Sequence, residues 1–239
     1  MKLSRLLDRW HQEHTNNRWI YYFSIFVRIA LAAGFLPSGY VKVAGERFTA
    51  LANNHPMGAY LEALFHTGYY YTFIGVVQML AAILLLIPRT VTLGALLYLP
   101  IILNICILSF SVRFDGSLFT APLMVLSTLF LLWWNYDKIK YVLPWSSKTT
   151  HVTNAMPNKR TWKFPWKFVS AAFVIFIFVI GGVILMNVFV IMPRNSASAC
   201  QQQFKNGENA TLGAQFCECI HTEGRSLQQC LEAYPTLIK

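Results

Sequence analysis

The chain has 239 residues, 55% of them hydrophobic and only 13% charged, a composition that excludes an ordinary soluble globular domain. Its net charge of +10 comes from 20 Lys and Arg residues against 10 Asp and Glu residues. Most of these cations lie beside apolar runs, as in the loops of membrane proteins, so we attribute the charge to membrane topology and expect no nucleic-acid partner.

The first 42 residues contain two successive membrane elements. In residues 1–18, apolar side chains recur at helical spacing and basic residues fall on other faces, which predicts an amphipathic segment on the cytoplasmic face. Residues 19–42 form an apolar run long enough to span a bilayer, with Arg28 near its middle and Lys42 at its end. A charge at mid-span costs at least ~2.5 kcal/mol, so we expect Arg28 to face the inside of a helical bundle.

The polar stretch after Lys42 predicts a short interfacial helix that begins at Pro56. His55, Glu62 and His66 lie in this region, and Glu62 and His66 are one helical turn apart. That spacing also occurs in metal sites. A solvated polar face explains it more simply, and we expect no metal centre.

Three further apolar runs of spanning length follow. They cover residues 69–87, 91–112 and 118–134. The very short turn between the first two of these runs makes them antiparallel neighbours. Gln78 and Asn104 carry amide side chains inside the runs. Together with the first run, they are expected to form a four-helix transmembrane core over residues 19–140.

The remaining chain predicts a linker, a fifth transmembrane helix and a tail. These are a basic cytoplasmic linker at 141–166, the helix at 167–192 and a polar tail at 193–239. With the N-terminus in the cytoplasm, five spans place twelve Lys and Arg residues inside and seven outside. This bias predicts a multi-pass protein of a bacterial inner membrane, with an extracytoplasmic, periplasmic C-terminus.

The tail holds four of the five cysteines, Cys200, Cys217, Cys219 and Cys230. Because the extracytoplasmic side is oxidising, this even set predicts a disulfide framework. Cys217 and Cys219 are too close in sequence to bond each other well. Two pairings remain, Cys200–Cys217 with Cys219–Cys230 or Cys200–Cys219 with Cys217–Cys230. We expect a small helical hairpin joined by two disulfides, and leave open whether the Cys217-x-Cys219 pair is redox-active.

Two short motifs in the first two spanning runs point to a known family. The first is R-x5-G-x3-SG-x2-K in residues 28–42, and the second is G-x2-Q-x8-IPR in residues 75–89. Residues 19–140 resemble the DoxX-like family of small four-helix membrane proteins. The resemblance implies an all-α transmembrane bundle, here extended by a fifth helix and the cysteine-rich tail. Since some family members are subunits of quinone-linked oxidoreductases and others look like accessory factors, it also implies ties to membrane redox chemistry.

Gln78 departs from the family pattern, which commonly has a glutamate at this place. A glutamate could neutralise Arg28, whereas Gln78 could only accept a hydrogen bond from it. The charge of Arg28 would then be compensated by Glu46 or Asp115, by water with backbone carbonyls, or by a bound anionic or quinone-like ligand. The candidate ligand-binding residues are Arg28, Lys42, Gln78 and Asn104.

These features favour a non-catalytic membrane subunit or assembly factor of a larger complex, which docks through its helices and presents the tail outside. We expect membrane lipids and a membrane or extracytoplasmic protein as partners, and the sequence predicts no catalytic residue and no enzyme acting on its own. One alternative is a quinone-binding component of a membrane oxidoreductase, with Arg28, Gln78 and Asn104 as polar contacts and a quinone or lipid as the cofactor. Another alternative is a small transporter.

Overall fold

The structure is a computed structural model that describes residues 17–139, 161–188, 191–205 and 209–234. Within these ranges every regular element is a helix. The helices are α2 (Arg18–Val43), α3 (Pro56–Phe65), α4 (Tyr69–Leu86), α5 (Val91–Ser111), α6 (Thr120–Trp134), α7 (Tyr136–Ile139), α8 (Trp166–Val188), α9 (Ala197–Gln202), α10 (Ala210–His221) and α11 (Leu227–Ala233). Residues 1–16 of the predicted amphipathic segment and 141–160 of the predicted linker lie outside the described residues.

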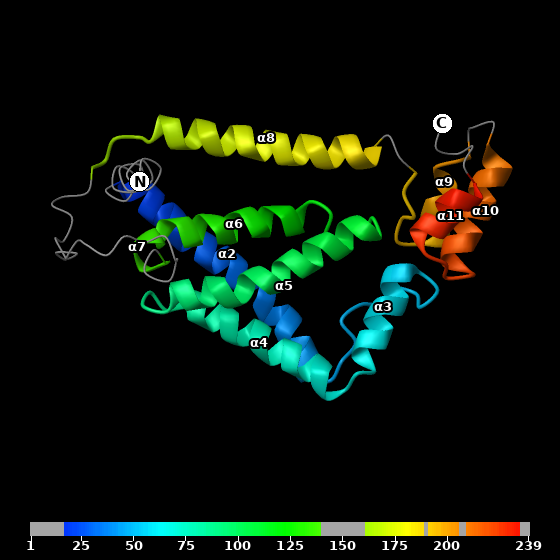
Figure 1. Cartoon of the computed structure of the whole chain (residues 1–239), viewed down its shortest axis with the longest axis horizontal. Helices are drawn as coiled ribbons and strands as arrows, with labels where there is room; N and C mark the ends of the chain where they lie inside the picture. The colour runs from blue at the N-terminus through cyan, green and yellow to red at the C-terminus, as the bar shows by residue number, and fades with distance from the viewer. Residues whose placement is uncertain (1–16, 140–160, 189–190, 206–208, 235–239) are drawn as a thin grey trace.

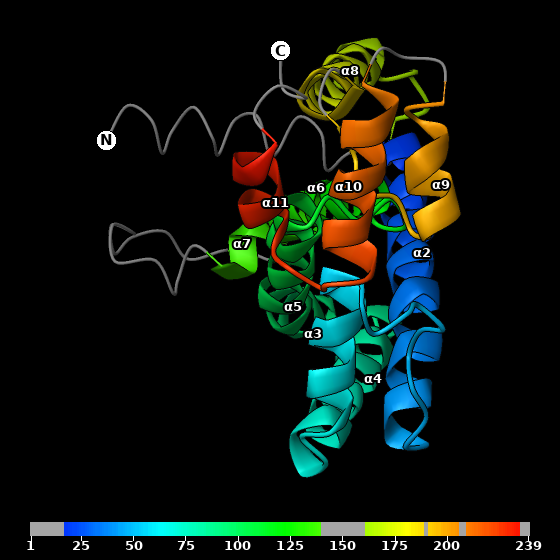
Figure 2. The ribbon, with the colours of Figure 1, turned by 90° about the vertical axis from the view of Figure 1, so that its right-hand side faces the viewer.

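Helices α2, α4, α5 and α6 form an antiparallel bundle (Figure 1). α4 packs against both α2 and α5, and α6 packs against α5 and, less extensively, α2. The short turn between α4 and α5 forces these two helices side by side. α3 and the tail helices lie at one end of the bundle, which we call the tail end (Figures 1 and 2).

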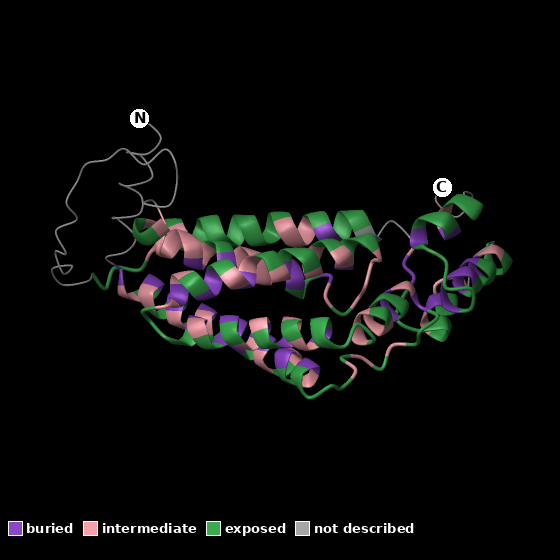
Figure 3. Cartoon of the chain, turned by 60° about the horizontal axis from the view of Figure 1, so that its bottom comes forward, coloured by how far each residue is buried: buried purple, intermediate pink, exposed green. Residues whose placement is uncertain are grey.

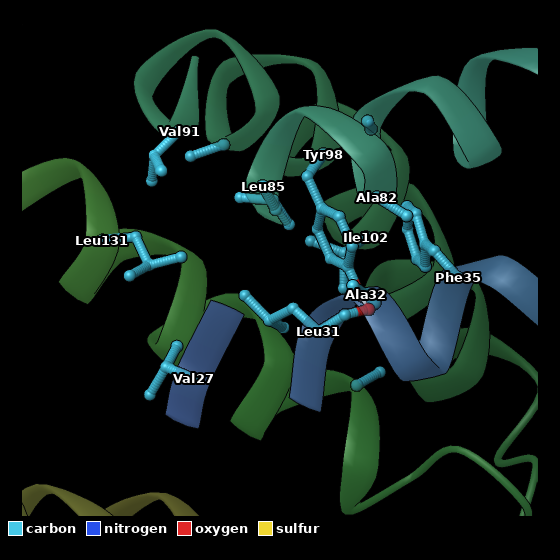
Figure 4. Close-up of a cluster of buried hydrophobic side chains, with 13 residues drawn as sticks. Val27, Leu31, Ala32, Phe35, Ala82, Leu85, Val91, Tyr98, Ile102 and Leu131 are labelled. Carbon is cyan, nitrogen blue, oxygen red and sulfur yellow. Dashed lines mark hydrogen bonds between the residues drawn. The ribbon is translucent and has the colours of Figure 1, made fainter. Parts of the chain in front are cut away.

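The core of the bundle is a set of apolar side chains from all four helices (Figure 4). Tyr98 of α5 is fully buried among them, and its ring stacks on Phe35 of α2 with the ring centroids 3.6 Å apart. The Tyr98 hydroxyl donates a hydrogen bond to the backbone carbonyl of Leu31 at 3.2 Å. Because the hydroxyl has a partner, this large aromatic ring fills the core without leaving a buried polar group unsatisfied.

The closest approach between α2 and α4 is made by two glycines. A Cβ atom on Gly39 would lie 2.8 Å from the carbonyl oxygen of Gly75, and a Cβ atom on Gly75 would lie 2.8 Å from the carbonyl oxygen of Gly39. Two helices can approach this closely only where neither has a side chain. The glycines therefore set the spacing and the register of α2 against α4.

The chain is a multi-pass membrane protein. Four described helices, α2, α4, α5 and α8, are long and apolar enough to cross a membrane. α6 is apolar but has only 15 residues, fewer than the ~20 that a span usually needs. The predicted run at 118–134 is thus present as a helix of the bundle, but it is shorter than predicted and not a full span by its own length.

Helix α8 is anchored to the rest of the protein near its two ends. Near its start, the Phe168 ring lies 6.1 Å from that of Phe23 and 5.7 Å from that of Phe130. Near its end, Val183 packs with Leu118 and Met192. Between these contacts most of the α8 surface is exposed (Figure 3). Within the described chain, α8 is thus the least covered of the long helices.

The fifth helix ends earlier than the sequence predicts. Its described part stops at Val188, and Ile191 and Met192 are not helical. Pro193 explains part of the difference, because a proline disfavours helical backbone at the residue that precedes it. The predicted helix end at residue 192 is therefore wrong, and residues 191–196 form a non-helical connection to the tail.

The tail folds around two disulfides, Cys200–Cys217 and Cys219–Cys230. This is one of the two pairings that the sequence allows. The four cysteines are buried together with Phe216 and Ile220 in a small core that is separate from that of the bundle. The predicted helical hairpin is instead a set of three short helices, α9, α10 and α11.

Candidate functional site

A polar cluster lies inside the bundle at the tail end of α2. The Lys42 ammonium donates hydrogen bonds to the backbone carbonyl and to the hydroxyl of Ser38, at 3.0 and 2.9 Å. The Ser38 hydroxyl in turn donates to the Oε1 atom of Gln78 at 3.4 Å. Lys42 and Ser38 are one helical turn apart, and the glycine contact between α2 and α4 brings Gln78 within reach. The SG-x2-K motif thus builds a chain of three polar side chains, which we call the Lys42 cluster.

Lys42 is buried and has no carboxylate within salt-bridge distance among the described residues. Aromatic rings face the ammonium instead, since its nitrogen lies 4.2 Å from the ring centroid of Phe48 and 5.9 Å from that of Tyr71. Such rings attract a cation through their quadrupole, most strongly where water is excluded. The Tyr71 hydroxyl donates to the backbone carbonyl of Glu46 at 3.0 Å, which holds the loop after α2 over the cluster.

Arg28 lies in a different part of α2. With Gly39 opposite Gly75 in an antiparallel pair, eleven residues back along α2 place Arg28 level with Leu86, the last residue of α4. Its guanidinium is half-buried, and its Nε atom is buried without a hydrogen-bond partner among the described residues. Arg28 therefore lies near the end of α4 that is remote from the tail.

No hydrogen bond joins Arg28 to Gln78 among the described contacts, although Gln78 is able to accept one. The same register places Gln78 about 12 Å from Arg28 along the helix axis, at ~1.5 Å per residue. The predicted counter-charges are also elsewhere, since the Glu46 side chain is exposed and Asp115 lies 3.8 Å from Arg194. The glycine contact thus sets a register that separates Arg28 from Gln78.

Asn104 is exposed on α5 and does not join the Lys42 cluster. Of the four candidate ligand residues, the structure thus brings Lys42 and Gln78 together through Ser38 and leaves Arg28 and Asn104 apart. The described helices therefore do not bring Arg28, Gln78 and Asn104 together in a single pocket.

The polar residues of the loop before α4 form an ion-pair network. Glu62 lies 2.8 Å from Arg47 and 3.0 Å from the Nε2 atom of His66. Glu62 lies on α3 and His66 caps the C-terminal end of that helix one turn later, and α3 begins at Pro56 as predicted. In the described part of the chain, no group of three or more His, Cys, Asp or Glu side chains has the arrangement of a metal site.

The connection between α8 and the tail is held by side chains from the loop between α5 and α6 and from the tail itself. Arg113 donates to the backbone carbonyl of Ile191 at 2.8 Å, and Asp115 forms the ion pair with Arg194. From the tail itself, the Nε2 atom of His221 lies 2.8 Å from the carbonyl oxygen of Pro193. The non-helical connection is therefore fixed on two sides, by the bundle and by α10.

His55 and His221 form a pair that sequence reasoning missed. Both are buried, and their ring centroids are 5.2 Å apart. The Nδ1 atom of His55 accepts a hydrogen bond from the backbone N–H of Met57 at 3.1 Å and so caps α3. Burial, and next the nearby His221, lower the pKa of His55 to about 4, against a smaller opposing effect of the Arg194 backbone. His55 is thus neutral at pH 7 and links α3 to the tail.

Replacing Lys42 by methionine should leave the thermal stability of the purified protein unchanged or higher. Methionine keeps the apolar stem, while the substitution removes a buried cation that has no carboxylate partner among the described residues. The midpoint of thermal unfolding in mild detergent, followed by tryptophan fluorescence, measures the effect. A fall of more than ~5 °C would assign Lys42 a structural role, since a shift of that size corresponds to about 1 kcal/mol or more.

Comparison with known proteins finds one informative similarity. The chain is 36% identical over 117 residues to the uncharacterized protein YwoB of Bacillus subtilis, a match that covers 46% of this chain and 75% of YwoB. No family model matches the chain. No solved structure matches it either.

Proposed function

The chain belongs to the same family as YwoB, and we infer a function from the geometry of the chain itself because the name of that relative states no activity. We propose that it is a non-catalytic subunit or accessory factor of a larger membrane complex. In this role the bundle and α8 lie in the bacterial inner membrane and the tail is presented on the periplasmic side. We also propose that the chain is DoxX-like, because its first two spanning runs resemble that family and four of its helices form a bundle.

The exposure of α8 is the observation that carries this proposal. Large apolar side chains of α8 are far more exposed than a packed helix would leave them, as with Phe178 at 81%, Leu185 at 68% and Met186 at 71%. Apart from the nearby backbone of α8 itself, no described atom lies within 4 Å of a Cβ built on Gly181 or Gly182. A helix surface that exposes glycines together with large apolar side chains is suited to close packing against another membrane helix.

The construction of the tail agrees with the same role. Two disulfides and a separate small core make it rigid, and Arg113, Asp115 and His55 tie it to the bundle. A rigid, pre-ordered surface loses less conformational entropy when it binds, so the tail is suited to bind a partner protein. The five-span arrangement with the N-terminus inside remains part of this proposal, supported by the distribution of Lys and Arg along the chain.

A quinone-binding role is the second proposal, and the Lys42 cluster is the observation that favours it. Lys42, Ser38 and Gln78 offer hydrogen-bond donors and an acceptor inside an apolar bundle, as sites for small ligands do. Arg28 and Asn104 are not part of this second proposal, because they lie away from the cluster.

Site-specific photocrosslinking in intact cells tests the subunit proposal. A benzophenone amino acid at Phe178 should crosslink to one protein, and the same protein should co-purify with the full chain in mild detergent at a fixed ratio. The matched control places the same probe at Phe35, which is buried inside the bundle and should give no intermolecular crosslink. A chain that elutes alone with a retained quinone, and whose Lys42→Met variant loses the quinone, would favour the second proposal instead.

A further inference from the structure

An open cavity of about 570 Å³ lies where the tail meets the end of α5. One wall is the end of α5 and the other is α11. The apolar lining residues are Phe110, Leu227 and Leu231, and the polar ones are Ser111, Arg113, Gln228 and Glu232. Cavities that bind small molecules have this range of volumes, mostly apolar walls and a few placed polar groups. None of the roles assigned above uses this cavity.

Arg113 gives the cavity a cation that forms no salt bridge with a carboxylate among the described residues. The guanidinium is half-buried, its described hydrogen bond goes to a neutral backbone carbonyl, and burial lowers its pKa from the usual value. Asp115, two residues later, is paired with Arg194. A partly desolvated cation without a carboxylate partner attracts an anion, and a guanidinium binds phosphate oxygens especially well.

The backbone of Arg113 adopts an unfavourable conformation. Its φ angle is +49°, in the left-handed region. This conformation costs roughly 1–2 kcal/mol for a residue that has a Cβ atom. Such strained residues concentrate at sites that bind ligands.

Phe110, which lines the cavity, belongs to an exposed apolar stripe on α5. Leu103, Ile107 and Phe110 recur at helical spacing and are exposed, with Ile107 at 64%. α5 is one of the spanning helices and ends at Ser111, so this apolar stripe faces the hydrocarbon and leads up to the cation at the membrane boundary. A lipid with an anionic head group and an acyl chain matches this arrangement, with the head group at Arg113 and the acyl chain along the apolar stripe of α5.

The opposite rim of the cavity restricts the kind of head group. Gln228 donates to the Glu232 carboxylate at 3.0 Å, and both side chains are exposed on α11. A carboxylate at the rim repels a head group with several negative charges, but it accepts hydrogen bonds from hydroxyl groups. A singly charged phosphodiester whose head group carries hydroxyls fits both sides of the cavity.

We propose that the cavity between α5 and α11 is a binding site for phosphatidylglycerol. The phosphodiester lies at Arg113, the glycerol hydroxyls face Glu232, and an acyl chain follows Ile107 and Phe110 along α5. The lipid joins the tail to the bundle and reinforces the hydrogen bond from Arg113 to the connection.

The test reconstitutes the full chain in nanodiscs of phosphatidylcholine that contain a small fraction of photoactivatable phosphatidylglycerol. After irradiation, mass spectrometry should locate crosslinks on peptides that contain Phe110 and Leu231. Arg113→Gln keeps an amide donor for the Ile191 carbonyl but removes the charge, and should lower the crosslink yield ~10-fold, as expected for loss of a charge-assisted bond. Gln228→Trp fills the cavity from its exposed rim without touching Arg113, and should lower the yield similarly.

The matched control is Arg225→Gln, which removes a cation of the tail that is paired with Glu223 and lies outside the cavity. It should leave the yield unchanged. Equal yields in all four proteins, or equal labelling by a photoactivatable phosphatidylcholine of the same chain length, would overturn the proposal and reduce the signal to lipids that surround any membrane protein. Intact disulfides in each variant, checked by mass without reduction, exclude misfolding of the tail as the cause of a loss.

Discussion

Replacing Gly39 by alanine should destabilise the bundle by ~1–3 kcal/mol, the usual cost of overpacking a close contact. The added methyl group would lie 2.8 Å from the Gly75 carbonyl oxygen and 2.7 Å from the Cγ atom of Met79. The methionine side chain can move, but the carbonyl belongs to the backbone of α4, so α2 and α4 have to separate. Gly75→Ala should have the same effect, because its methyl group meets the Gly39 carbonyl. The midpoint of thermal unfolding in mild detergent measures the loss.

The control for both substitutions lies in α8. Gly181→Ala adds the same methyl group to a membrane helix at a position with no described neighbour within 4 Å. In the chain purified free of any partner, the unfolding midpoint should therefore stay the same or rise slightly. The Lys42 cluster depends on the same close approach of α2 and α4. If Gly39→Ala and Gly181→Ala shift the midpoint equally, the glycine contact does not set the spacing of α2 and α4.

Lowering the pH from 7 to 5 should loosen the tail from α3 by about 2 kcal/mol. His55 is neutral in the folded protein because its pKa is about 4, whereas an unfolded histidine has a pKa of 6.5. The unfolded state therefore binds more protons between these two values. The stabilisation from neutral His55 is complete above about pH 6.5 and is lost progressively as the pH falls toward 4.

Two physical effects act together when His55 is protonated. A proton on its Nδ1 atom removes the acceptor for the Met57 N–H, so α3 loses its cap. The new charge is also buried beside His221, whose ring centroid lies 5.2 Å away. Hydrogen–deuterium exchange of residues 191–205, corrected for the intrinsic pH dependence of exchange, should show faster exchange at pH 5 than at pH 7.

Two histidine variants separate this effect from general acid sensitivity. His55→Asn keeps a side chain that can cap a helix but does not titrate in this range, and should make the exchange of residues 191–205 nearly independent of pH. His66→Gln removes an exposed histidine on the same helix that pairs with Glu62, and should leave the pH dependence as it is in the parent protein. The reverse pattern would assign the acid response to the Glu62 pair.

Hydropathy and helical periodicity were sufficient to predict the all-helical membrane fold. The predicted runs at 19–42, 69–87 and 91–112 match α2, α4 and α5 to within one residue at each end. Length and apolar content are properties of a local stretch of chain, and a bilayer imposes the same requirement on every span. The helix that begins at Pro56 was predictable for a similar reason, because proline favours the first turn of a helix.

Features that depend on contacts between distant segments came only from the tertiary structure. Cysteine spacing left two disulfide pairings open, and the packing of α9, α10 and α11 selects one of them. The separation of Arg28 from Gln78 follows from the register that two glycines impose, and that register is a property of two helices in contact. His55 and His221 are 166 positions apart, so no local pattern could pair them. Each stretch of sequence thus determined its own helix, whereas the packing of the helices decided which charged and polar side chains come into contact.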